Sequence, residues 1–228
     1  MFLFQLLALT GEWTKARTQL NALAQLSPEA QMFAVAYGQA IDAEQSRADV
    51  FAGKAPVSLL VKSQAWTEDL AAALTHEIAG KADEAEAARD RAYDAAPDMK
   101  GSIDGVAFDW IADADHRFGP ALEAIIAGKW GLVPFDAVEK IKSKGPQALS
   151  DLIWYPVEIA FKSGQSVAGF LPGRYPGTET GGDNAAVLAR VTHEIESPMG
   201  PLLTGQHVLA LSTGEERDLL SLRVLDMG

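Results

Sequence analysis

Two approximate copies of an eighteen-residue segment constrain the fold of this chain more than any other feature. The copies are GEWTKARTQLNALAQLSP at residues 11–28 and GKADEAEAARDRAYDAAP at residues 80–97. Both open on Gly, carry Ala at the sixth position and close on Pro. Gly favours a left-handed turn that ends one helix, Ala lets two helices approach closely, and Pro stops the following helix. The repeat therefore predicts helical hairpins.

The two copies start 69 residues apart, about two periods of the 34-residue tetratricopeptide repeat (TPR). The second copy and the helix before it have small residues where the helices of such a hairpin come close, at Ala73, Ala85 and Ala92. The first copy keeps Ala16 but has Phe4 and Leu23 at the other two positions. We predict degenerate TPR-like hairpins. The alternative is that an Ala-rich amphipathic helix ending at Pro imitates this spacing.

Helical periodicity covers most of the first hundred residues. It predicts helices over residues 2–9, 12–25, 28–51, 66–79 and 82–95. Ser27 is expected to cap the third helix, with Pro28 at its first position, and residues 53–64 read as an irregular connection. The first helix is apolar on its far side as well. We expect that side to be covered by a preceding segment or by a partner.

After Pro97 the helical periodicity stops, and short alternating runs separated by Gly and Pro take over. One short helix is predicted at 108–112. Candidate strands cover residues 122–126, 130–133, 138–141, 157–162, 166–171, 187–196, 206–212 and 218–225. Short strands with frequent turns favour a small barrel or a curled antiparallel sheet. The predicted fold is α+β, with a TPR-like helical domain over 1–100 and a β-rich, barrel-like (SH3-like) antiparallel domain over 101–228.

Charge and cysteine content exclude several classes of function. The chain has 31 acidic and 19 basic residues, a net charge of −12, and no cluster of Lys or Arg. This argues against nucleic acid or an anionic membrane as a partner. The lack of Cys excludes disulfides, Cys-ligated metals and thiol catalysis, and it suits the cytoplasm. The apolar opening MFLFQLLAL is too short to span a bilayer and lacks a basic flank.

One dense group of chemically capable side chains is present, Asp113, Asp115 and His116 in the run DADH. Carboxylates and imidazole suit several divalent ions, so a metal-dependent hydrolase is one alternative. The other is that these Asp side chains bond nearby backbone amides. Nucleophile-elbow, zinc-protease and dinucleotide motifs are missing from the sequence. We therefore expect no enzyme activity, no cofactor and no metal.

Aromatic residues and one arginine are the candidates for partner contact. Arg174 and Tyr175 lie in the glycine-rich segment 169–184, which we predict to be a surface loop because it lacks the Lys-Ser/Thr of a phosphate loop. A guanidinium beside a phenol on a Pro-Gly turn suits recognition. Trp154 and Tyr155 read either as core residues at the mouth of the barrel or as a contact surface. The six candidates are Trp13, Trp66, Trp154, Tyr155, Arg174 and Tyr175.

Several segments give the chain a resemblance to the ImpE/TagJ family, accessory proteins of bacterial type VI secretion systems. They are FLFQLLALTGEW near the start, IDGVAFDWIADADHRFGP, LIWYPVEI, GFLPGRYPGTE and the closing GEERDLLSLR. The resemblance implies TPR-like helices, a small β-barrel-like domain and no enzyme activity. It also implies a partner, the small subunit of the contractile sheath, bound through the N-terminal helix of that subunit. The family usually has further helices before FLFQL, and its members are thought to influence sheath assembly or recycling by an AAA+ unfoldase.

A binding mode follows from this expectation. Stacked helical hairpins leave an apolar groove into which an amphipathic helix can place its i, i+3 and i+4 side chains. The acidic surface favours a partner with basic residues around its apolar stripe. A generic TPR-like adaptor with another client is the alternative from the same class. The oligomeric state is left open.

Overall fold

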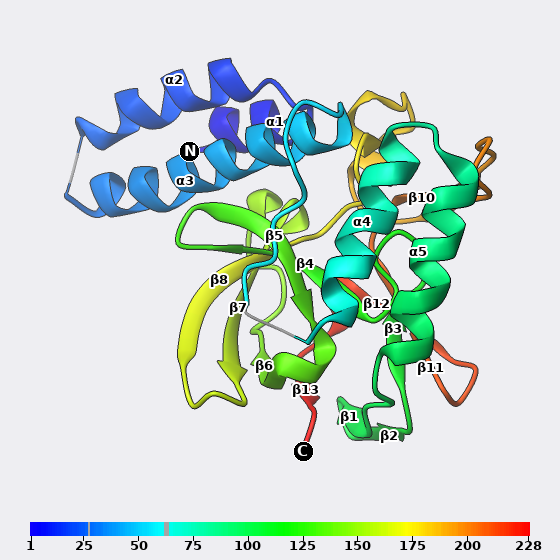
Figure 1. Ribbon diagram of the computed structural model, residues 1–228. Coiled ribbons are helices and arrows are strands. Elements are labelled where there is room, and N and C mark those ends of the chain that lie inside the picture. The colour runs from blue at the N-terminus through cyan, green and yellow to red at the C-terminus, as the bar shows by residue number, and fades with distance from the viewer. Residues whose placement is uncertain (27, 62–63) are drawn as a thin grey trace.

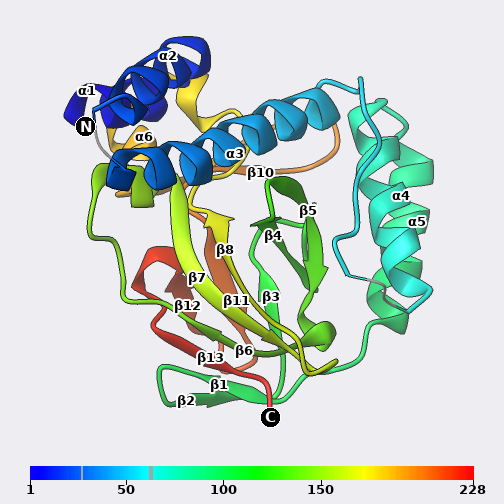
Figure 2. The same cartoon turned by 90° about the vertical axis from the view of Figure 1, so that its left-hand side faces the viewer.

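The computed structural model describes residues 1–26, 28–61 and 64–228, so the predicted cap Ser27 lies outside the described residues. The helices that precede the first strand are α1 (Phe2–Leu9), α2 (Trp13–Ala24), α3 (Pro28–Phe51), α4 (Trp66–Ile78) and α5 (Ala82–Ala95). Helices α1–α3 form a layer above the sheets, and the α4–α5 hairpin stands along one flank (Figures 1 and 2). The five predicted helices are confirmed to within a residue at each end.

The turns of the repeat have the geometry that its composition predicts. Gly11 and Gly80 both have left-handed backbones, with φ of 71° and 70°. Ala16 and Ala85 are both completely buried where the helices of each pair meet. Because both alanines are completely buried, a larger side chain at either position would push the neighbouring helices apart. Hairpin formation is confirmed, and its TPR-like character in detail stays a prediction.

The second part of the chain forms antiparallel sheets. The strands are β1 (Gly101–Ile103), β2 (Val106–Phe108), β3 (Ile111–Asp113), β4 (Ala121–Ile126), β5 (Lys129–Pro134), β6 (Val138–Lys142), β7 (Trp154–Phe161), β8 (Ser166–Pro172), β9 (Thr192–Ile195), β10 (Leu202–Gly205), β11 (Val208–Leu211), β12 (Glu216–Asp218) and β13 (Val224–Asp226). Eight of them pair in the order β2-β1-β13-β6-β7-β8-β4-β5, three in the order β12-β11-β3, and β9 with β10. The α+β class is confirmed.

The sheets stay open, which corrects the predicted barrel. In the described part of the chain, the end strands β2 and β5 of the large sheet do not pair with each other. The far edge of β5 is instead covered by the segment before α4. Leu60 donates its backbone N–H to the Leu132 carbonyl at 3.0 Å, and Leu132 donates to the Ser58 carbonyl at 2.8 Å. This part of the irregular connection therefore protects a sheet edge from other chains.

Three sequence predictions after residue 100 are wrong. The helix at 108–112 is replaced by the ends of β2 and β3. The strand at 187–196 is divided into α6 (Asn184–Val187) and β9, because the Asp183 side chain accepts from the Ala185 N–H at 2.8 Å and caps the helix. The strand at 218–225 is interrupted by a 3₁₀ turn at Leu219–Ser221. Strands β1, β2, β3 and β10 have no counterpart in the prediction.

Helices and sheet share one apolar cluster. Trp154 on β7 is completely buried and lies against Phe4 of α1, Trp13 of α2 and Tyr37 of α3, with ring centroids 5.7–6.4 Å apart. The cluster also contains Trp130 of β5. The helical layer is thus anchored on the sheet by aromatic side chains, while the division into two domains near residue 100 stays a prediction. In the described ranges, no helix has the length and apolar character needed to cross a membrane.

Candidate functional site

Buried charged side chains gather where α3 meets the sheets. The group consists of Glu44, Arg47, Asp113, Asp115, Arg117, Glu123, Arg174 and His207, which we call the buried charged network. They come from α3, from the segment around β3, from β4 and from the two segments that follow β8 and β10. Buried charges are costly unless they are paired and hydrogen-bonded, so each needs an identifiable partner.

Glu123 is the centre of the network. Its carboxylate accepts from Arg47 Nε at 2.7 Å and Nη2 at 2.5 Å, and from Trp130 Nε1 at 2.7 Å. His207 Nε2 lies 3.0 Å from the same carboxylate. Burial alone would raise the pKa of Glu123, but the charge of Arg47 and these hydrogen bonds lower it to about 2. Glu123 is therefore ionised in the interior and joins α3 to β4.

His207 bridges two carboxylates. Its Nδ1 lies 2.7 Å from Asp113 Oδ2, and its Nε2 contacts Glu123. Both ring nitrogens can donate only when the imidazole is protonated. Burial opposes that charge, but the charge of Asp113 and the bonds to both carboxylates outweigh it and raise the pKa of His207 to about 9. Tyr175 completes the group by donating its hydroxyl to Asp113 Oδ1 at 2.8 Å.

The pH dependence of stability follows from His207. Its pKa is about 9 in the fold against an ordinary 6.5, so the stabilisation from this proton is complete below about pH 6.5 and is lost as the pH rises through 9. We expect the free energy of unfolding to fall by up to about 3 kcal/mol between pH 6.5 and 9.5. Urea titrations across this range measure it. The exposed control His193→Gln should show the same fall in the free energy of unfolding with pH, and His207→Gln should not show it. A wild-type free energy of unfolding that does not change between pH 6.5 and 9.5 would contradict the assignment to His207.

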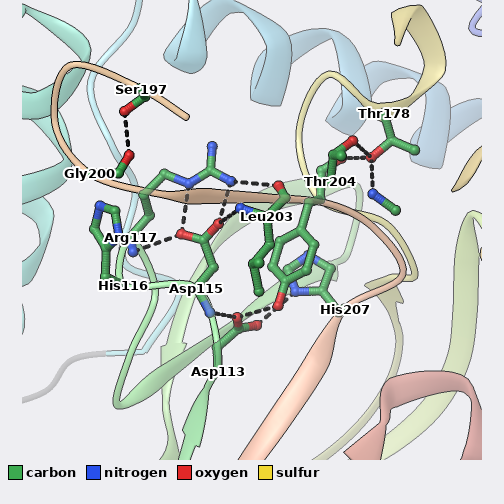
Figure 3. Close-up of polar contacts among 12 residues, drawn as sticks. Asp113, Asp115, His116, Arg117, Thr178, Ser197, Gly200, Leu203, Thr204 and His207 are labelled. Carbon is green, nitrogen blue, oxygen red and sulfur yellow. Dashed lines mark hydrogen bonds and ion pairs between the residues drawn. The ribbon is translucent and has the colours of Figure 1, made fainter. Parts of the chain in front are cut away.

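The side chains of the DADH run point to three different partners, which corrects the metal-dependent hydrolase alternative. Asp115 accepts from Arg117 Nε at 2.8 Å and Nη2 at 2.6 Å, and from the Leu203 N–H at 2.8 Å. Asp113 faces His207, while His116 stands apart from both (Figure 3) and contacts Glu77 of α4 at 3.2 Å. Among the described residues there is no group of three His, Asp or Glu side chains suited to hold a metal. The run instead joins β3, β10 and α4.

Arg174 and Tyr175 are buried, so their segment is not the predicted surface loop. Arg174 donates from Nη1 to the carbonyls of Leu9 at 3.0 Å and Val187 at 2.7 Å. The Tyr175 ring lies over His207, with centroids 3.9 Å apart. That Arg174 and Tyr175 contact a partner stays a prediction, because their position in the fold does not test it. In the fold they secure the end of α1 and the centre of the network.

The remaining candidates differ in accessibility. Trp66 is buried and donates Nε1 to Asp136 at 3.3 Å, and Tyr155 is buried with its hydroxyl on the Leu222 carbonyl. Trp154 is buried in the aromatic cluster described above. Trp13, at the start of α2, is half-buried and is the one of the six that retains accessible surface. A direct contact with a partner therefore stays open for Trp13 without any rearrangement.

The sequence analysis missed five members of the network, namely Glu44, Arg47, Arg117, Glu123 and His207. A signal exists for Arg47. Ala40, Ala43, Arg47 and Val50 are all buried at alternating intervals of three and four, so a charged residue occupies a core position of α3. Such a residue needs a buried counter-charge, but nothing local indicates that it is Glu123.

Exposed apolar side chains gather on the first three helices and the residues at their ends. In the described part of the chain these are Met1, Phe2, Leu3, Leu6, Leu26, Met32 and Val35. Met32 is 76% exposed and Leu3 is 51% exposed, although both are strongly apolar. Helix α1 buries Phe4 and exposes Leu3 and Leu6, so one side of it is apolar and uncovered within this chain. That a preceding segment or a partner covers this side stays a prediction. Grouped exposed apolar residues of this kind mark interaction surfaces.

Comparisons with known proteins agree with this organisation. A family model described as ImpE protein matches residues 105–226. The type VI secretion system accessory component TagJ of Pseudomonas aeruginosa is 38% identical over 226 residues, which cover 99% of this chain and 79% of TagJ. The crystal structure of protein VPA1032 from Vibrio parahaemolyticus matches with a TM-score of 0.86 and 21% identity, over 99% of this chain and 84% of that one. The last match shows a shared fold.

Proposed function

This chain belongs to the ImpE family, and on that premise we propose that it is a non-enzymatic accessory component of a bacterial type VI secretion system. It binds the N-terminal helix of the small contractile-sheath subunit and modulates sheath assembly or recycling in the cytoplasm. The observation that carries the proposal is the 38% identity to the accessory component TagJ along 99% of this chain. In this proposal residues 1–100 form the TPR-like binding domain, and residues 101–228 form a supporting domain of open antiparallel sheets.

The exposed apolar side chains of α1 and α3 supply the docking surface of this proposal. An amphipathic helix places its apolar stripe against such side chains, and a stable complex buries roughly 1,200 Å² or more in total. Leu3, Leu6, Met32 and Val35 are available for this without any movement of the fold. Of the six candidate residues, Trp13 at the start of α2 is the one that such a helix could also reach. The buried charged network holds α3 through Arg47 and the end of α1 through Arg174.

Titration with a synthetic peptide of the sheath subunit's N-terminal helix tests the proposal. We expect saturable one-to-one binding with a Kd in the micromolar range or below, about −8 kcal/mol. Met32→Asp and Leu3→Asp should each weaken binding tenfold or more, because a carboxylate replaces an apolar contact. Both side chains are exposed, so neither change should unfold the protein. Calorimetry measures the affinity.

The matched control is Val224→Asp, another exposed apolar residue that lies on β13 at the opposite end of the molecule (Figure 1). Its affinity for the peptide should equal that of the wild type. A folded protein that binds no peptide would refute the sheath-binding function and favour an adaptor with another client. Peptide binding that both α1 and α3 variants retain would refute the docking surface alone.

A further inference from the structure

We propose that a pocket between the start of α2, the second half of α3 and the turn after Tyr175 receives a basic side chain of the protein partner. The proposal rests on the proposed function, because it assumes a protein partner. The pocket has a volume of about 270 Å³ and is lined by Trp13, Glu44, Arg47, Phe51 and Glu179. This volume is below the roughly 300–1,000 Å³ typical of sites for drug-sized ligands, so it suits one long side chain better.

The carboxylates of the pocket are not balanced by its cations. Glu179 is half-buried, and in the described ranges its carboxylate has no hydrogen bond or ion pair within 4 Å. Its charge nevertheless raises the pKa of Arg47 and opposes the lowering of the pKa of Arg174 by burial. Glu44 is 7% exposed, and its Oε2 lies 3.5 Å from Arg47 Nη1, at the limit of a hydrogen bond. The Nε and Nη2 groups of Arg47 are already occupied by Glu123. Glu44 also accepts from Trp154 Nε1 at 3.2 Å. The pocket lining therefore holds two carboxylates and one guanidinium, and most of the N–H groups of that guanidinium are bound outside the pocket.

The second nearby cation is also committed. Arg174 donates from Nη1 to the carbonyls of Leu9 and Val187 rather than to a carboxylate. Burial raises the pKa of Glu44, with the charges of Arg47 and Arg174 opposing, and the charges of Glu123 and Glu179 raise it further. A positive group entering between Glu44 and Glu179 would relieve this repulsion. The local charge thus selects for a cation.

The walls of the pocket suit the same ligand. Trp13 and Phe51 provide aromatic surface beside the carboxylates, and a guanidinium stacks on such faces while its N–H groups bind carboxylate oxygens. Ala48 and Gly177, which also line the pocket, are exposed, so it opens to solvent on the helical side. An arginine on the polar border of a docked helix has the length and chemistry to fill it.

The test uses the full chain with Nα-acetyl-arginine amide as the probe. We expect a saturable shift of the Trp13 indole N–H signal in NMR spectra, reduced at least fivefold in affinity by Glu179→Gln. Nα-acetyl-citrulline amide, which has the same shape without the charge, should give no saturable shift. The exposed control Glu86→Gln should leave the arginine response unchanged. Equal responses to both probes, or an unchanged response in Glu179→Gln, would overturn the proposal.

A second measurement separates this inference from the function it rests on. Each Lys or Arg of the sheath peptide is replaced singly by Gln and tested against wild type and Glu179→Gln. At one position of the peptide, the replacement by Gln should lower the affinity for the wild-type protein at least fivefold. The same replacement should not lower the affinity for Glu179→Gln any further. Binding of the peptide without any such coupled position would refute the pocket and leave the function intact. A peptide that does not bind refutes the function, and the arginine probe then decides on the pocket.

Discussion

Replacing Arg47 by Leu is expected to destabilise the protein by about 3–5 kcal/mol, because the change leaves Glu123 ionised and buried without its main counter-charge. The Arg47 side chain is 7% exposed and that of Glu123 is 1% exposed, so water cannot replace the lost guanidinium. Arg47 also donates to the Arg174 carbonyl at 2.9 Å, and this bond is lost as well. The melting temperature should fall by roughly 6–20 °C.

Arg91→Leu is the matched control. Arg91 contacts Asp69 at 2.7 Å, a distance similar to that of the buried pair, but its side chain is 58% exposed. Its replacement should cost no more than about 1 kcal/mol. Urea unfolding of both variants measures the difference. A loss below about 1 kcal/mol for Arg47→Leu would show that the interior of the network is hydrated or that Glu123 becomes neutral at little cost.

The double variant Arg47→Leu/Glu123→Leu tests the same reasoning from the other side. Removing both partners leaves no unpaired charge at this pair, so part of the lost stability should return. Recovery remains incomplete because His207 and Trp130 lose their acceptor on Glu123. The double variant could instead lose more unfolding free energy than the two single variants lose together. That result would indicate that the network as a whole, rather than the pair, carries the stability.

Local features of the sequence were sufficient to predict the helices. Gly11 and Gly80 end helices in left-handed turns, and Ala16 and Ala85 allow close packing, whatever the rest of the chain does. The order of the strands in the large sheet was not predictable in this way. Strand β13 at the end of the chain pairs with β1, joining Ser102 to Asp226, and such a distant pairing leaves no local signal.

The candidate site shows the same limit. Arg174 and Tyr175 were predicted to be at the surface because a Gly- and Pro-rich segment usually forms an exposed turn. Their partners, the Leu9 carbonyl and Asp113, lie far away in the sequence and draw both side chains inside. Glu123 lies in an otherwise apolar strand, which predicts burial but not the identity of its counter-charge. The type of a residue thus predicted whether it is buried only where its bonding partner lies nearby in the sequence.

Trp154→Ala is expected to lower the free energy of unfolding by about 3–5 kcal/mol, the second large effect. The indole is completely buried and contacts rings from all three helices of the layer, and its Nε1 donates to Glu44 at 3.2 Å. Truncation leaves a cavity at the junction of helices and sheet, so helical and tertiary signals should be lost together at lower urea concentration. Trp110→Ala, at a tryptophan that is 42% exposed, should change stability by no more than about 0.5 kcal/mol.

Trp154→Phe separates packing from recognition. It keeps an aromatic ring in the cluster, removes the hydrogen bond to Glu44 and leaves a smaller cavity than Ala, so the expected loss of unfolding free energy is about 1–3 kcal/mol. If Trp154 acts solely through the fold, Trp154→Phe binds the sheath peptide as the wild type does, measured where both proteins are folded. A tenfold loss of affinity in the folded Phe variant would instead mean that the helical layer opens and that Trp154 itself meets the partner. Circular dichroism on the same samples establishes that they are folded.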